Sequence, residues 1–142
     1  MHDSTTSFID TVKKAGYSVT KTRLTVFKVL LNSEALRMNE IVQLSAPAIN
    51  RASVYRTIDL FEKLGIVQRV QHGWKYTIEL TDTYHHHHHH MRCLSCHKLF
   101  TIEGDTHLEI DLKKLAAAQH FTMTQHTVEI QGYCKICTQK SV

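Results

Sequence analysis

Four cysteines lie in the second half of this sequence, in two pairs with the same spacing. Cys93 and Cys96 form one Cys-x-x-Cys pair, and Cys134 and Cys137 form the other. Each pair can bring two thiolates to one ion, and four thiolates at about 2.3 Å form a closed tetrahedral Zn²⁺ site of the structural kind. We therefore expect these cysteines to bind a structural zinc ion. Disulfides and an iron–sulfur cluster are the alternatives that the cysteine count leaves open.

Six consecutive histidines, His85 to His90, lead directly into the first cysteine pair. An affinity tag is one interpretation, but tags stand at termini or in linkers. If the run forms a strand, alternate imidazoles point to opposite faces, so they can supply two metal sites or remain partly solvated. Mixed histidine and carboxylate donors suit Fe²⁺, Mn²⁺, Co²⁺ or Zn²⁺. Further donors of these types follow at Glu103, His107, Glu109 and His126.

A small sheet is needed to position these donors. Residues 98–102 and 121–132 have strand patterns, and a helix is expected from Thr106 to about His120. Thr106 and Glu109 have the spacing of a capping box, although a carboxylate can cap and ligate through different oxygens. A three-stranded sheet with one helix cannot cover both of its own faces. We therefore expect a homodimer.

The first half contains no cysteine and has the pattern of several helices followed by a hairpin. Apolar periodicity predicts helices over residues 8–15, 20–31, 39–44 and 51–64, then strands over 66–70 and 76–80. This order is typical of a winged helix-turn-helix. The predicted fold is therefore α+β, with an N-terminal winged helix-turn-helix domain and a small C-terminal α/β dimerisation domain.

The fourth helix carries polar and basic residues in its N-terminal half. These are Arg51, Ser53, Tyr55 and Arg56. In the second helix of a helix-turn-helix, side chains at such positions reach base edges and phosphates. Tyr55 lies about 100° around the helix axis from the apolar stripe, on the more exposed side of the helix. A packing role for Tyr55 is the alternative, because surface arginines are common in any small helical domain.

Composition limits the class of protein. The chain has 142 residues, of which 42% are hydrophobic, so we expect a folded protein rather than a disordered one. No apolar run approaches the roughly 20 residues of a membrane-spanning helix, and the first residues do not have the pattern of a secretory signal. A soluble, cytoplasmic protein without a membrane partner is expected. The net charge of +4 permits nucleic-acid binding without requiring it.

Taken in order, these motifs resemble the ferric uptake regulator (Fur) family of metal-dependent transcriptional repressors. The resemblance covers nearly the whole chain. It rests on the histidine run, both cysteine pairs and the following segments: Lys13-Lys14-Ala15-Gly16, Val19-Thr20-x-x-Arg23-Leu24, Ala52-Ser53-Val54-Tyr55-Arg56-Thr57-Ile58, Leu64-Gly65-Ile66-Val67 and Glu79-Leu80-Thr81.

The resemblance implies two domains, one that binds DNA and one that forms a dimer. Residues 1–82 would form the winged-helix DNA-binding domain, and residues 83–142 the metal-binding dimerisation domain. A homodimer would bind a double-stranded DNA operator. By resemblance, Tyr55 and Arg56 contact the DNA, and Lys14 enters the minor groove.

The resemblance also implies three sets of metal ligands. The four cysteines correspond to the structural zinc site. A regulatory site at the domain junction maps onto Glu79, His88, His90 and Glu103. An additional site maps onto His87, His89, Glu109 and His126. The family often supplies one more histidine before the third helix, but residues 35–38 contain none, so the DNA-binding domain would supply fewer ligands here.

We therefore expect a metal-responsive DNA-binding transcriptional repressor, with Fe²⁺ as the regulatory ion and metal uptake genes as targets. Zn²⁺-, Mn²⁺- or peroxide-responsive regulation is the alternative within the family. A metal-buffering protein without operator binding is the alternative outside it. We expect no enzyme activity, because four thiolates leave no open coordination position and no general base is evident near the histidines.

Overall fold

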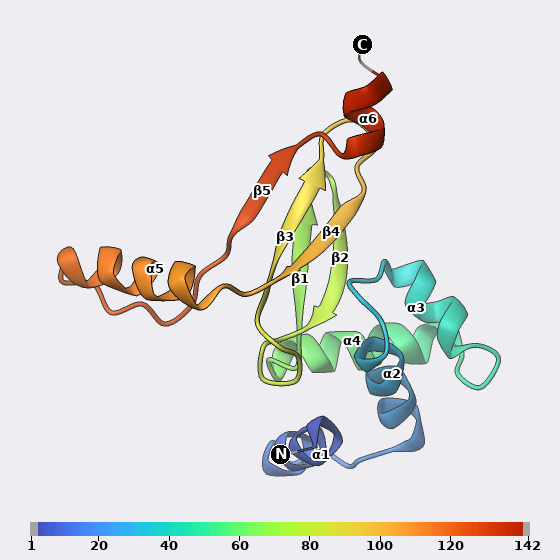
Figure 1. Cartoon of the computed structure of the whole chain (residues 1–142). Coiled ribbons are helices and arrows are strands. Elements are labelled where there is room, and N and C mark those ends of the chain that lie inside the picture. The colour runs from blue at the N-terminus through green and yellow to red at the C-terminus, as the bar shows by residue number, and fades with distance from the viewer. Residues whose placement is uncertain (1–2, 141–142) are drawn as a thin grey trace. The chain divides into compact units, whose positions relative to one another are not determined.

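The computed structural model describes residues 3–140. The chain divides between His85 and His86 into two compact units, whereas the sequence predicts a boundary after residue 82 (Figure 1). Among the described residues, no helix is long and apolar enough to cross a membrane. The α+β class and the helix-then-sheet order agree with the prediction.

The first unit contains four helices and a hairpin. The helices are α1 (Ser4–Lys14), α2 (Lys21–Leu31), α3 (Met38–Ser45) and α4 (Arg51–Lys63), and the hairpin pairs β1 (Val67–His72) with β2 (Lys75–Leu80). Side-chain caps start two of the helices: Thr20 accepts from the Arg23 N–H at 3.2 Å, and Asn50 accepts from the Ser53 N–H at 2.9 Å. Gly65 follows α4 with a φ of +69°, a left-handed conformation suited to glycine.

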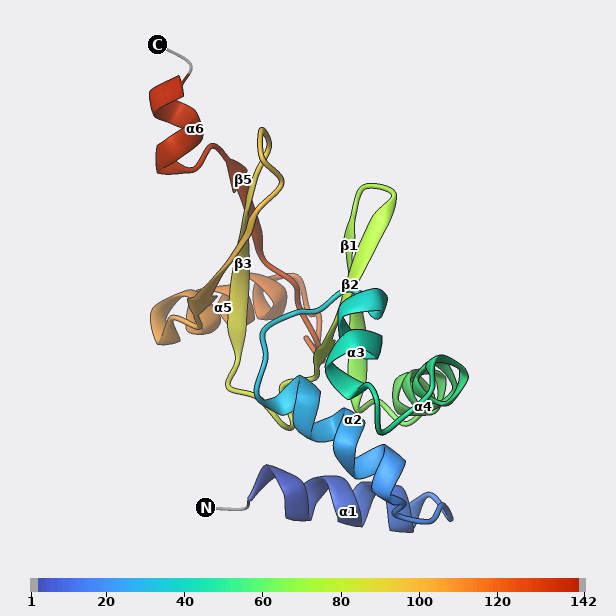
Figure 2. The same ribbon diagram turned by 90° about the vertical axis from the view of Figure 1, so that its right-hand side faces the viewer.

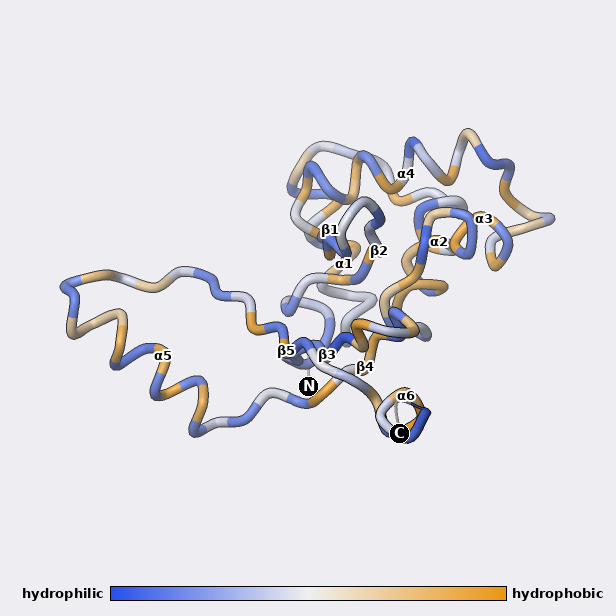
Figure 3. The backbone as a smooth tube through the Cα atoms, turned by 90° about the horizontal axis from the view of Figure 1, so that it is seen from above, coloured by the Kyte–Doolittle hydropathy of each residue, from blue (hydrophilic) through white to orange (hydrophobic). Residues whose placement is uncertain are grey.

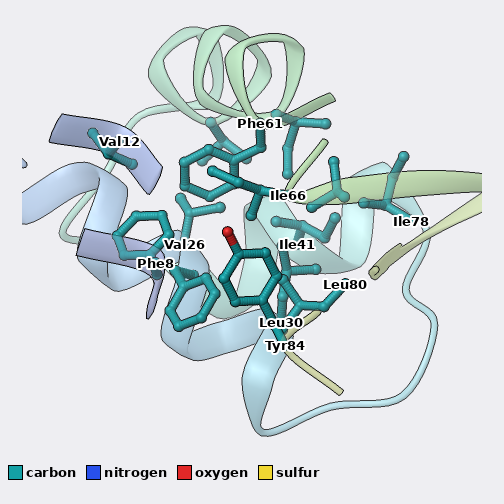
Figure 4. Packing of buried hydrophobic residues seen from close by; sticks show 14 of the residues in the cluster. Phe8, Val12, Val26, Leu30, Ile41, Phe61, Ile66, Ile78, Leu80 and Tyr84 are labelled. Carbon is teal, nitrogen blue, oxygen red and sulfur yellow. The ribbon is translucent and has the colours of Figure 1, made fainter. Parts of the chain in front are cut away.

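Aromatic side chains form the centre of this unit (Figure 4). Phe8 stacks on Phe27 with ring centroids 4.2 Å apart, and Phe61 meets Phe8 edge-on at 5.4 Å. Tyr84 packs edge-on against Phe27 at 5.5 Å, and its hydroxyl donates to Thr11 Oγ1 at 2.7 Å. The core therefore ties α1, α2 and α4 to the segment that follows the hairpin.

The hairpin is fixed to the helices by its second strand. Leu36, in the loop between α2 and α3, forms an isolated bridge with Ile78 of β2. The Leu36 N–H donates to the Ile78 carbonyl at 2.9 Å, and the Ile78 N–H donates back at 2.7 Å. The hairpin is antiparallel and fully paired, from Val67 opposite Leu80 to His72 opposite Lys75. Its base therefore has a fixed position in the unit.

The second unit is built around one central strand. Strand β3 (His88–Cys93) pairs antiparallel with β4 (Leu99–Glu103) and parallel with β5 (Glu129–Gly132). Helix α5 (Thr106–Ala118) connects β4 to the segment before β5, and a short helix α6 (Lys135–Lys140) follows β5. The three-stranded sheet agrees with the prediction, whereas α6 was not predicted.

Two local predictions for this unit are wrong. The third strand is only Glu129–Gly132; residues 121–127 lie outside the sheet, and His126 among them lies 2.9 Å from Glu109. The capping box of Thr106 and Glu109 does not form. Asp105 is the N-cap instead, and its carboxylate accepts from the His107 N–H at 2.7 Å. An aspartate one residue earlier caps as well as a threonine, which leaves the Glu109 carboxylate available to other partners.

No residue of helix α5 is fully buried, and the hydropathy colours of Figure 3 change repeatedly along it. Apolar and polar residues are interleaved along it, and Ile110 and Leu115 are exposed. Phe121, Ile130 and Tyr133 are also exposed on this unit. Apolar surface of this extent in so small a unit is typical of a protein–protein interface.

Replacing Phe27 with alanine is expected to destabilise the first unit by about 3–5 kcal/mol, because it leaves a cavity beneath Phe8 and Tyr84. The free energy of unfolding, measured in urea at constant zinc, checks this value. Lys28→Ala on the exposed side of the same helix is the matched control and should change stability little. Equal effects of both variants would contradict the assigned core.

Candidate functional site

The four cysteine sulfurs converge in the second unit. Cys93 ends β3, Cys96 lies in the turn after it, and Cys134 and Cys137 flank the start of α6. All four are free thiols, and their Sγ atoms lie within 4.8 Å of one another. Cys96 and Cys134 are 3.9 Å apart. A tetrahedral zinc ion with bonds of about 2.3 Å requires sulfurs separated by about 3.8 Å, so the thiols fit zinc and are not paired as disulfides.

The thiols differ in how readily they lose a proton. Backbone N–H groups of Cys134 and Cys96 stabilise the Cys93 thiolate and lower its pKa to about 6, against the effect of burial. A hydrogen bond with Ser95 lowers the pKa of Cys137, but interactions with Cys134 and burial outweigh it and raise that pKa to about 11. The Cys93 thiol therefore becomes a thiolate, the form that binds metal, more readily than the Cys137 thiol.

A second donor group forms on one face of β3. His87 and His89 point to the same side, where Glu109 of α5 and His126 meet them. Glu109 Oε1 lies 3.0 Å from His87 Nε2 and 2.8 Å from His89 Nε2, and Glu109 Oε2 lies 2.9 Å from His126 Nε2. Three imidazoles and one carboxylate are a donor set that suits Fe²⁺, Mn²⁺ or Zn²⁺. We refer to these four residues as the imidazole–carboxylate cluster.

The cluster is partly shielded from solvent. Burial raises the pKa of Glu109, but hydrogen bonds from His89 and His126 and the charge of His87 outweigh it and hold that pKa below its ordinary value. The carboxylate is therefore ionised and ready to act as a ligand. Gly104 permits the local packing, since a Cβ at this position would lie 2.8 Å from His87 Cδ2.

The opposite face of β3 carries His88 and His90. Their ring centroids are 5.0 Å apart, and His90 is buried. Glu103 lies opposite His88 in the β3–β4 register, so its side chain leaves the sheet on the same face, but it is exposed and joins no converging donor group in residues 3–140. Glu79 lies in the first unit, on β2, where it is buried and accepts from Gln68 Nε2 at 2.8 Å.

The predicted DNA-contacting residues lie on α4 and α1. Arg51 and Arg56 are exposed, and Tyr55 is half-buried. The Arg51 guanidinium lies 5.1 Å from the centre of the Tyr55 ring and donates to its hydroxyl at 3.1 Å. Arg51 and Tyr55 therefore place a positive charge and an aromatic ring side by side. Lys14 is exposed in the last turn of α1.

A groove with both polar and apolar walls runs beside these residues in the first unit. Its lining includes Ser53 and Arg56 of α4 together with Thr22 and Arg23 of α2. The functional prediction did not include Arg23. The signal available for it was the Thr20 cap, which places Arg23 in the first turn of α2, where helix N–H groups favour an anion. Two guanidinium groups in one groove suit phosphate.

Comparisons with known proteins agree with these features. The family model described as "Ferric uptake regulator family" matches residues 14–131. The ferric uptake regulation protein of Escherichia coli K12 is 31% identical over 131 residues, which cover 87% of this chain and 85% of that protein.

Solved structures show the same fold. The Helicobacter pylori ferric uptake regulator is 23% identical, with a TM-score of 0.75, covering 95% of this chain and 91% of that one. The Vibrio cholerae ferric uptake regulator is 28% identical, with a TM-score of 0.67, covering 89% of this chain and 99% of that one. The family match over most of the chain and the identity to the curated relative lead to one conclusion: this chain belongs to the ferric uptake regulator family of metal-responsive regulators.

Proposed function

We propose that this protein is a homodimeric, Fe²⁺-dependent repressor that binds a double-stranded DNA operator and controls metal uptake genes. The observation that carries the proposal is the convergence of three imidazoles on the two oxygens of Glu109, at 2.8 to 3.0 Å. Such a cluster holds nitrogen and oxygen donors ready for an exchangeable divalent ion. The thiolate group has no comparable freedom, because four sulfurs complete a tetrahedron around zinc.

The two donor groups would have different roles. Zinc bound by Cys93, Cys96, Cys134 and Cys137 would join the end of β3 to the start of α6 and stabilise the second unit. An ion bound by the imidazole–carboxylate cluster would hold α5 and residues 121–128 against β3. Because α5 and Phe121 expose apolar side chains, this ion would also order the surface expected to form the dimer.

His88 and His90 are proposed as regulatory ligands, with Glu79 and Glu103 as the remaining ligands implied by family resemblance. The support from the second unit is the adjacency of the two imidazoles on one face of β3. An ion that binds one arrangement of the dimer more tightly shifts the population toward it. A tenfold gain in DNA affinity requires only about 1.4 kcal/mol of such preference.

On DNA, α4 would enter the major groove. Its exposed N-terminal half, with Tyr55 and Arg56, would meet base edges and phosphates, and Lys14 would reach the minor groove. Two copies related by a two-fold axis would read half-sites about 34 Å apart. The V. cholerae ferric uptake regulator has DNA-binding domains, which supports this use of the first unit.

The identity of the regulatory ion is tested by measuring which metal the protein contains when it is isolated from cells. Affinity measured in vitro does not suffice, since Zn²⁺ binds such donors more tightly than Fe²⁺. Protein isolated anaerobically from iron-replete cells should contain iron in addition to zinc. It should also protect a palindromic promoter sequence in footprinting, and chelation should abolish the protection. Recovery of zinc alone from iron-replete cells would overturn the assignment to iron.

Glu109→Gln is expected to weaken binding of the exchangeable ion by more than about tenfold, because loss of an outer-shell partner alone costs about that much. Metal titration followed by elemental analysis measures this, and zinc at the cysteines should be retained. Asp111→Asn, at an exposed position on the same helix, is the control and should bind metal normally. Normal metal binding by Glu109→Gln would exclude this carboxylate as a ligand.

Tyr55→Ala and Arg56→Ala are each expected to weaken operator binding by about tenfold or more, since they remove a base-edge and a phosphate contact. Anisotropy titration with labelled duplex measures the affinity, and elemental analysis should show unchanged metal content. Lys63→Ala, at the other end of α4, is the control. If metal binds normally but no duplex is bound by the unmodified protein, the metal-buffering alternative is correct.

A further inference from the structure

Tyr84 is a buried residue at the point where the chain leaves the first unit. Its relative exposure is only 5%, and the first unit ends at His85. Three residues after Tyr84, the chain reaches His87, the first member of the imidazole–carboxylate cluster. Any restraint that passes along the chain from the second unit to the first must therefore pass through Tyr84.

The segment before this boundary is fixed to the first unit by hydrogen bonds. The Thr81 N–H donates to the Ile66 carbonyl at 3.0 Å, and the Thr81 hydroxyl donates to the Gly65 carbonyl at 2.8 Å. The Tyr84 N–H closes a turn by donating to the Thr81 carbonyl at 2.9 Å. Residues 81–84 therefore belong to the first unit, and a hinge between the units is expected after them.

The hydroxyl and the carbonyl of Tyr84 both bind helix α1. The hydroxyl donates to Thr11 Oγ1 at 2.7 Å, and the carbonyl accepts from the Ser4 hydroxyl at 3.1 Å. Ser4 and Thr11 are seven residues apart, so they lie on one face of α1, about 10 Å from each other along its axis. Phe8 lies between them on this face and stacks on Phe27, which the Tyr84 ring meets edge-on. Tyr84 therefore contacts α1 over two helical turns.

Packing alone does not account for a tyrosine at this position. A phenylalanine would fill the same space against Phe27 without a hydroxyl that needs a partner when it is buried. Thr11 accepts from Tyr84, and its own hydroxyl donates to the Ser7 carbonyl at 3.0 Å. The two hydroxyls thus form a directed chain of hydrogen bonds from Tyr84 into the backbone of α1.

Helix α1 lies at the edge of the first unit, on the side away from the tip of the hairpin (Figures 1 and 2). Phe8 and Val12 are its buried residues, so the contacts with Tyr84 are a substantial part of what holds it. The last turn of α1 carries Lys14, which is proposed to reach the minor groove of the operator. The placement of α1 therefore decides the placement of this lysine.

We propose that Tyr84 is a positioning residue that couples metal binding in the second unit to the placement of α1, and thereby to the DNA contact of Lys14. This inference rests on the proposed metal-dependent DNA binding. An ion bound at His87 would restrain the chain that follows Tyr84, and the hydrogen bonds of Tyr84 would extend this restraint to α1. DNA binding would then require less ordering of α1, which gives positive cooperativity between the ion and the DNA.

The test removes one hydroxyl at a time from the full-length protein. Tyr84→Phe keeps the ring, and Thr11→Val keeps the shape of the side chain, but each variant loses the hydrogen bond between them. One labelled duplex, selected from random sequence by the unmodified Mn²⁺-loaded protein, is titrated with and without Mn²⁺. We expect each variant to lower the ratio of the two dissociation constants about three- to tenfold, the range of one net hydrogen bond. The double variant should lower it no further.

Thr25→Val is the matched control for these variants. The Thr25 hydroxyl donates to the Lys21 carbonyl at 2.9 Å, which is the same bond to the preceding turn that Thr11 makes with Ser7, but on α2. This variant should leave the Mn²⁺ ratio unchanged. Elemental analysis should show the same zinc content in all of the proteins.

Hydrogen exchange supplies a readout that does not involve DNA. In the unmodified protein, Mn²⁺ should slow the exchange of the backbone amides of residues 8–14, because the bound ion restrains α1 through Tyr84. In Tyr84→Phe, Mn²⁺ should have little effect on these amides.

Two outcomes would overturn the proposal while the proposed function stands. If Tyr84→Phe lowers the free energy of unfolding in urea but keeps the full Mn²⁺ ratio, Tyr84 only stabilises the first unit. If Mn²⁺ strengthens DNA binding by the unmodified protein without slowing exchange in α1, the coupling does not pass through this helix. If Mn²⁺ does not change DNA binding by the unmodified protein, the proposed function and this inference both fail.

Discussion

The pleat of β3 is the constraint on which the proposed metal sites of this protein depend. Side chains of a strand alternate between two faces, so consecutive histidines are separated into two donor groups without any change of residue type. His87 and His89 face Glu109 and His126, and His88 and His90 lie together on the other face. The same strand ends at Cys93 and reaches the thiolate group. One short backbone segment thus supplies ligands to donor groups of different chemistry.

The donor groups differ in what they allow an ion to do. Four thiolates surround zinc completely, which suits a permanent structural ion in a sheet too small to bury its own faces. Three imidazoles and a carboxylate bind less selectively and exchange more readily, which suits a response to supply. With this difference, the proposed zinc ion would be retained while a second ion binds and dissociates. Glu109 is also the residue through which α5 contacts the histidines, so an ion bound by the cluster would hold α5 against β3.

Much of this structure could be predicted from local sequence signals. The Thr20 and Asn50 caps, the glycine after α4 and the apolar periodicities define the helices, and the cysteine spacing indicates the thiolate group. The predictions from local sequence are wrong where a contact between distant residues overrides the local pattern. Residues 121–127 have strand-like composition, yet they lie outside the sheet, where His126 contacts Glu109. Glu109 has capping-box spacing, but Asp105 takes the capping role. Ligand sets cannot be read from spacing alone, because the partners come from elements far apart in sequence.

The uniformity of the histidine run has a consequence for how this gene can change. In an ordinary strand, inserting or deleting one residue moves every side chain to the wrong face. Here an added or lost histidine codon would place another imidazole at most of the vacated positions, so the donor types on both faces would be preserved. A run of identical ligands therefore keeps the donor types on both faces of the strand when the length of the run changes.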